Sequence, residues 1–96
     1  MRYARDCVRR ACGADWNAGW LALAAIETGT RLAEIAVPAH IIAGEQDAST
    51  PPELMQGMLA IPGASLEVIA DAPHMIALTH PAALAQAILR GTAKGR

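Results

Sequence analysis

The sequence is poor in aromatic residues and cysteine, and it has no long apolar run. It contains no phenylalanine, one tyrosine and two tryptophans, so any core must be built mainly from aliphatic side chains and alanine. The two cysteines, Cys7 and Cys12, do not form a CxxC motif or a disulfide framework, which fits reduced thiols in the cytoplasm. The longest apolar run, residues 20–26, is much shorter than the roughly 20 residues of a spanning helix. We therefore expect a soluble, cytoplasmic protein with no membrane contact.

Strong charge of either sign is also missing. The formal net charge is −1, and the only basic cluster, which Asp6 interrupts, consists of Arg2, Arg5, Arg9 and Arg10. Nucleic-acid binding needs a denser basic face, so we expect no nucleic-acid partner. The three histidines lack the close spacing of a zinc site, and no glycine-rich phosphate loop follows a predicted strand. The sequence therefore predicts no metal and no cofactor.

The length and composition predict one small folded domain. A 53% hydrophobic and 18% charged composition excludes a disordered tail. A domain of this size buries only roughly 60–65% of the surface of its unfolded chain, and alanine gains little from burial. Such a lightly filled core is easier to explain if larger partners pack against it.

The local patterns predict helices first and then a strand–helix–strand–helix order. Residues 1–30 form a helical segment, with one helix over 3–11 and another from Asp15 to residue 24. An apolar strand over 39–43 lies between Pro38 and Gly44, as in a buried parallel sheet. A helix follows from the prolines at 51–52, a second strand covers 65–70, and a last helix begins near Pro81. We expect an α/β fold in which 31–91 form a βαβα unit with two parallel strands, and a frayed tail at 92–96.

Two ionisable residues follow the predicted strands closely. Asp47 lies three residues after Gly44, and His74 lies a few residues after the second strand. The carboxyl ends of adjacent parallel strands meet at one edge of a sheet, where functional groups collect. A carboxylate beside an imidazole can fix its tautomer and stabilise the imidazolium while the histidine acts as a general base. The sequence therefore predicts an acid–histidine pair at this edge.

The same landmarks resemble the C-terminal part of the α/β-hydrolase family, from about residue 32 to 90. The resemblance is carried by an apolar strand, a glycine, the acid and a Thr-Pro (VPAHIIAGEQDASTP, 37–51), by the turn IPGA (61–64), and by APH (72–74) and THP (79–81). Residues 1–30 resemble the end of a cap region. Among the branches, the sequence is most similar to the 3-oxoadipate enol-lactonases and related esterases.

This resemblance implies catalytic roles for two positions. Asp47 would be the acid and His74 the general base of a Ser-Asp-His triad that hydrolyses a small-molecule ester or lactone. Two residues depart from the family pattern, because Pro73 stands where glycine is common and Thr79 stands where an acidic residue is common. The larger departure is the absence of a Gly-x-Ser-x-Gly elbow, since neither Ser49 nor Ser65 has the flanking glycines. The chain alone is therefore expected to be inactive, and its expected partner is either another copy of the chain, in a homo-oligomer, or the N-terminal half of the fold.

Other interpretations stay open at this stage. Asp47 can be an ordinary loop residue that caps the following helix, and an isolated histidine is more often structural than catalytic, which we expect for His40 and His80. The alternative function is a non-catalytic truncated module that acts through self-association or partner binding at an exposed sheet edge. Trp16 and Trp20 would then belong to a core or an interface.

Overall fold

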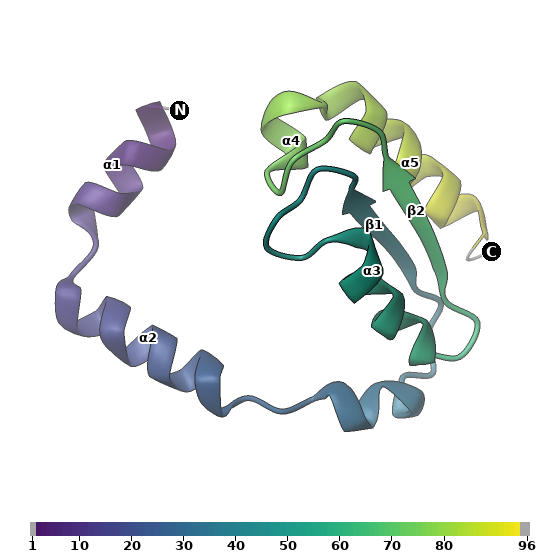
Figure 1. The fold of residues 1–96 in the computed structure, drawn as a ribbon, viewed down its shortest axis with the longest axis horizontal. Coiled ribbons are helices and arrows are strands. Elements are labelled where there is room, and N and C mark those ends of the chain that lie inside the picture. Colours follow the sequence, from purple (N-terminus) through teal and green to yellow (C-terminus); the bar gives the residue numbers. More distant parts are fainter. Residues whose placement is uncertain (1, 95–96) are drawn as a thin grey trace.

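The computed structural model describes residues 2–94, and its ribbon is shown in Figure 1. Two helices come first, then a 3-10 helix, and then a compact part built around two strands. In chain order the elements are α1 (Arg2–Arg10), α2 (Gly13–Ala25), η1 (Gly29–Glu34), β1 (His40–Gly44), α3 (Pro52–Met55), η2 (Gln56–Ala60), β2 (Ser65–Ile69), α4 (Ile76–Thr79) and α5 (Pro81–Lys94).

The two strands form a parallel sheet, as the sequence predicts. His40 lies opposite Ser65 and Gly44 lies opposite Ile69, so both strands end at the same edge. The chain between them forms α3 and η2, with Pro52 in the first turn of α3, where its missing N–H costs nothing. The expected strand–helix–strand–helix order is therefore present.

The core lies between the sheet and α5. Ile69, Ala72 and Ala87 are buried together, with Ile42 and Leu84 packed against them. Because side chains alternate along a strand, Ile42 and Ile69 share the face of the sheet that α5 covers. Figure 1 shows α5 on one side of the two strands and α3 on the other. These buried side chains fix both strand ends, and therefore the loops that follow them.

The N-terminal helices are arranged differently. α1 and α2 contain no buried residue, and in Figure 1 they extend away from the compact part. The helix expected from Asp15 begins two residues earlier, at Gly13, with Cys12 as its N-cap and Asp15 in its first turn. Trp16 and Trp20 are exposed rather than in a core, so this segment contributes no packing to the sheet.

The last helix ends later than the expected frayed tail suggests. α5 continues through Gly91 to Lys94, and Thr92 donates hydrogen bonds to the carbonyls of Ile88 and Leu89. The other two residues of the expected tail, 95 and 96, lie outside the described part of the chain. A short helix that the sequence analysis did not predict, α4, follows the loop of His74.

Candidate active site

The loop after β1 holds the Asp47 carboxylate in one orientation. Oδ1 accepts the backbone N–H groups of Ser49 and Thr50 at 2.8 and 2.9 Å, and Oδ2 accepts the Thr50 hydroxyl at 2.8 Å. Asp47 is the one buried charged side chain in the part of the chain that the structure describes. A buried carboxylate is tolerated when its oxygens are satisfied in this way. Three donors from its own loop therefore fix the Asp47 carboxylate independently of His74.

These donors also keep Asp47 ionised. The backbone N–H of Thr50 is the main cause of a pKa far below the usual aspartate range. Burial acts in the opposite direction, while the hydrogen bonds from His74, the Thr50 hydroxyl and the Ser49 N–H lower the pKa further. A carboxylate that accepts several N–H bonds is stabilised in its charged form. Asp47 is therefore an anion at neutral pH.

His74 completes the pair from the second loop. Its Nδ1 lies 2.9 Å from Asp47 Oδ2, across 27 positions of sequence. Because an ionised carboxylate only accepts hydrogen bonds, Nδ1 carries the proton and Nε2 keeps a free lone pair. The expected juxtaposition of Asp47 and His74 is present in the structure.

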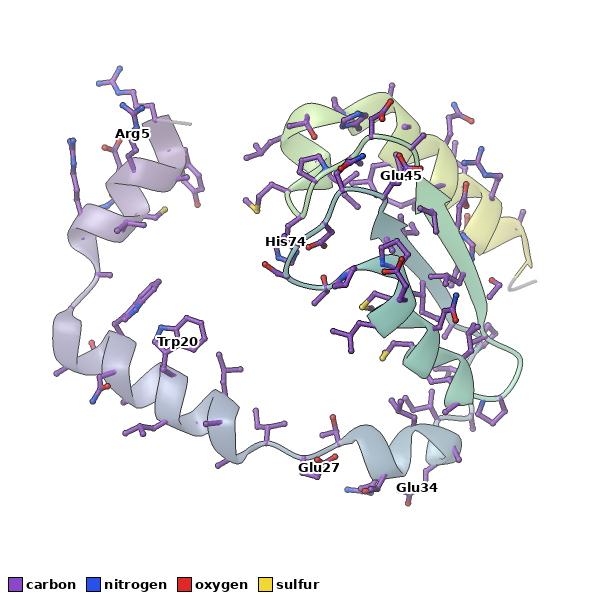
Figure 2. All side chains as sticks on the ribbon, viewed as in Figure 1. Arg5, Trp20, Glu27, Glu34, Glu45 and His74 are labelled. Carbon is purple, nitrogen blue, oxygen red and sulfur yellow. The ribbon has the colours of Figure 1, made fainter. Side chains whose placement is uncertain are left out.

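The two members of the pair differ in exposure. The Asp47 side chain is 5% exposed and the His74 side chain is 57% exposed. His74 lies at the tip of the compact part that faces α1 and α2 (Figure 2). Within residues 2–94, no hydrogen bond involves Nε2 of this ring. The basic nitrogen is thus open to a reacting group, while the carboxylate that orients it is shielded.

Close contact between the two loops positions the pair. The backbone N–H of Gln46 donates to the carbonyl of Ala72 at 2.9 Å. At Gly44 a Cβ atom would lie 2.5 Å from the Ala72 oxygen and 2.6 Å from the Pro73 oxygen, closer than real Cβ contacts. Only glycine allows this approach, so Gly44 is required for the meeting of the two loops as well as for the end of the strand.

No nucleophile is placed at this site by the described residues. Ser49 contributes its backbone N–H to Asp47, and Ser65 begins β2 at the opposite end of the strands. The Thr50 hydroxyl lies 3.4 Å from Nδ1 of His74, on the carboxylate side of the ring. No group of three or more His, Cys, Asp or Glu in residues 2–94 is arranged to hold a metal ion. The site therefore contains an oriented base and its acid partner.

A second histidine–carboxylate arrangement lies at the amino ends of the strands, and we call it the His40 cluster (His40, Ser65, Glu67 and Arg90). His40 Nε2 lies 2.9 Å from Glu67 Oε2, and Nδ1 lies 2.6 Å from Ser65 Oγ. The side chain of Arg90 on α5 donates to Glu67, through Nε at 2.8 Å and through Nη2. The pKa of Glu67 is lowered by Arg90 first and by His40 second, and Glu67 in turn raises the pKa of Arg90.

The sequence analysis did not find this cluster, although it expected a structural role for His40. Nε2 donates to the Glu67 carboxylate, so Nδ1 accepts the Ser65 hydroxyl and neither ring nitrogen is free. The strand register would have indicated the cluster, since Ser65 and Glu67 lie opposite His40 and Ile42 on one face of the sheet. That register is not visible in the sequence before the strands are aligned.

The exposed tryptophans lie beside an open hollow between α1 and α2. The rings of Trp16 and Trp20 meet edge to face, with centroids 6.3 Å apart, and Cys12 lies at the same hollow. Backbone N–H groups of Asp15 first, and Ala14 second, lower the pKa of the Cys12 thiol. Figure 2 shows the Trp20 ring on the side of α2 that faces the compact part. No other part of the described chain covers the Trp16 and Trp20 side chains, which are exposed.

Comparison with known proteins gives information on the fold. No protein-family model and no curated protein matches the sequence. A solved structure of a hydrolase from Pseudomonas aeruginosa PA01 is similar to this chain, with a TM-score of 0.63 and 28% sequence identity. The match covers 71% of this chain and 26% of that hydrolase, so the similarity extends over about a quarter of that protein. The chain therefore has a fold similar to part of a hydrolase.

None of the helices described for residues 2–94 is long and apolar enough to cross a membrane.

Proposed function

We propose that this chain is the C-terminal part of an α/β-hydrolase and supplies the acid and the general base of a Ser-Asp-His triad. The observation that carries the proposal is the hydrogen bond from His74 to a shielded, ionised Asp47, with Nε2 of the ring free. The similarity to part of a hydrolase supports it. The serine would come from polypeptide outside these 96 residues.

The geometry suits both halves of an acyl transfer. Nε2 of His74 would take the proton of the serine hydroxyl while its oxygen attacks the carbonyl carbon of the substrate. Asp47 would stabilise the resulting imidazolium through Nδ1–H, and Nε2 would then give its proton to the leaving alkoxide. The same nitrogen would activate the water that hydrolyses the acyl-enzyme. The substrate class, a carboxylic ester or lactone, comes from the resemblance of residues 32–90.

A chimera tests this proposal. This chain would replace the matched quarter of the Pseudomonas aeruginosa hydrolase, and the product would be assayed with p-nitrophenyl acetate and a fluorophosphonate probe beside the intact parent. We expect activity in the chimera and a loss of at least about 10⁴-fold in kcat for His74→Ala. His80→Ala is the matched control, because within the described chain the His80 side chain forms a hydrogen bond only with its neighbour Thr79. A folded, active chimera that is indifferent to His74→Ala would overturn the proposal.

A second candidate, association with another copy or partner, is favoured by a different observation. The large apolar side chains of α2, including Trp16, Trp20 and Leu23, are exposed. Within residues 2–94 each strand of the sheet also has one unpaired edge, and such edges invite pairing. Analytical ultracentrifugation of the chain would show concentration-dependent association that Trp20→Ala weakens. A monomer at all concentrations would exclude self-association.

A further inference from the structure

The loops that carry Asp47 and His74 are joined by a hydrogen bond that a side chain accepts. Glu45 follows β1 directly, and its Oε1 accepts the backbone N–H of Asp71 at 3.0 Å, across 26 positions of sequence. The backbone N–H of Glu45 donates to the carbonyl of Ile69 at 3.0 Å. Glu45 therefore contacts the second loop at its beginning, through both its main chain and its side chain (Figure 2 labels Glu45 and His74).

The residue that receives this contact has an unusual backbone. Asp71 has φ of 60°, and it is the one non-glycine residue with positive φ in the described chain. Residues with a Cβ rarely adopt this left-handed conformation, and they keep it where the surroundings enforce it. The hydrogen bond to Glu45 is a contact that enforces it, because it fixes the direction of the Asp71 N–H. A change at Asp71 would redirect the chain leading to His74.

The pair has little tolerance for such a change. The His74–Asp47 bond is 2.9 Å long, and a displacement of the loop by about 1 Å would exceed the hydrogen-bond range. Asp47 cannot follow the histidine, because Ser49 and Thr50 hold its carboxylate. The position of the second loop therefore decides whether the pair forms.

We propose that Glu45 is a positioning residue that holds the His74 loop against the Asp47 loop and so maintains the Nδ1–H tautomer of His74. Its consequence for catalysis rests on the proposed function, but its effect on the tautomer does not. The role needs an acceptor oxygen at the end of this side chain and does not need its charge. Glutamine should therefore replace glutamate, and alanine should not.

The experiment is ¹⁵N imidazole NMR of the full 96-residue chain at about pH 9, above the ordinary histidine range. We expect the wild type and Glu45→Gln to show His74 protonated at Nδ1. Glu45→Ala should lose this signature and show Nε2–H, together with faster exchange of the Asp71 amide proton. Glu53→Ala is the matched control, since Glu53 is exposed on α3 and makes no side-chain hydrogen bond with the described residues. It should resemble the wild type.

Each result decides one question. A Glu45→Ala protein that keeps Nδ1–H overturns the role of Glu45 and leaves the Asp47–His74 pair intact. Equal loss in Glu45→Gln and Glu45→Ala also overturns it, because the charge would then matter rather than the hydrogen bond. If Glu45→Ala does not fold, Glu45→Asp takes its place, with the same expected loss because its side chain is one methylene shorter.

The failure of the proposed function looks different. A wild type without Nδ1–H would remove the pair on which that function depends. If the pair is present and Glu45 behaves as expected, but the chimera is inactive, the proposed function fails and the positioning role stands. In an active chimera, Glu45→Ala should lower kcat by about tenfold to a hundredfold with little change in KM.

Discussion

Two histidine–carboxylate arrangements lie at opposite ends of the same pair of strands, and they differ in what is left free. At the carboxyl ends, His74 uses Nδ1 to contact Asp47 and keeps Nε2 open. At the amino ends, both nitrogens of His40 are occupied, and its side chain is only 9% exposed. The same residue types therefore give an available base in one place and a structural link between α5 and the sheet in the other.

The comparison shows why residue type alone does not define a catalytic site. The His40 cluster contains a serine, a histidine and a carboxylate in hydrogen-bonded order, yet its ring packs against Gly91 and its carboxylate is shared with Arg90. The Ser65 N–H is also used, since it donates to the carbonyl of Ala39. Availability of the imidazole nitrogen distinguishes the two arrangements, and the predictions below test that distinction.

The largest expected effect comes from changing the Asp47 carboxylate and not that of Glu67. In the chimera, Asp47→Asn should lower kcat by about 10⁴-fold, because the asparagine amide donates to Nδ1 and moves the ring proton to Nε2. That nitrogen then cannot accept a proton from serine. ¹⁵N NMR of the chain alone should show the same shift of the His74 proton. Glu67→Gln should leave both the His74 tautomer and kcat unchanged, and a large loss of kcat in this variant would contradict the comparison.

For the free energy of unfolding, the order of the two sites should be reversed: changes at His40 should matter more than changes at His74. His40→Ala should lower the free energy of unfolding by about 1–3 kcal/mol, because it removes a nearly buried ring and the hydrogen bond of Ser65. His74→Ala should change it by less than about 0.5 kcal/mol, since the ring is mostly exposed and Thr50 still satisfies Asp47. Urea unfolding of both variants gives the comparison directly. Equal losses would show that the exposed histidine also stabilises the fold.

The sequence predicted the Asp47–His74 pair because strand ends and chain order were enough to place both loops at one edge. It did not predict the His40 cluster. That cluster depends on the alignment of His40 with Ser65 and on the salt bridge between Glu67 and Arg90, which lies on α5, far away in the sequence. The left-handed backbone of Asp71 was also not predicted, since aspartate adopts positive φ more often than most residues but the sequence does not show which loop aspartate does so. Local patterns specify elements and their order, whereas register and loop contacts arise only on folding.

Two glycines extend the comparison to packing. Gly44 lies against the His74 loop, and at Gly91 a Cβ atom would lie 2.5 Å from the His40 ring. Gly44→Ala should cost about 1–3 kcal/mol by overpacking against rigid backbone and should abolish the Nδ1–H signal of His74. Gly91→Ala should cost a comparable amount, because the added Cβ would displace the His40 side chain that Ser65 and Glu67 hold, and the gain of about 0.5–1 kcal/mol from alanine in the helix offsets this only in part. It should leave the His74 signal intact, and loss of that signal would refute the separation of the two sites.

The smallest expected effect is on acid stability, where the two carboxylates should behave alike in sign. The pKa values of Asp47 and Glu67 are both lowered in the folded chain, so each stabilises the fold above its unfolded pKa of about 4. That contribution is lost as the pH falls below about 4 toward the folded pKa. Urea midpoints at about pH 7 and pH 3 should therefore differ less in Asp47→Asn and in Glu67→Gln than in the wild type. The reduction should be larger for Asp47→Asn, because two backbone N–H groups and the Thr50 hydroxyl stabilise its charged form. An unchanged pH dependence in that variant would show that Asp47 is not a buried anion.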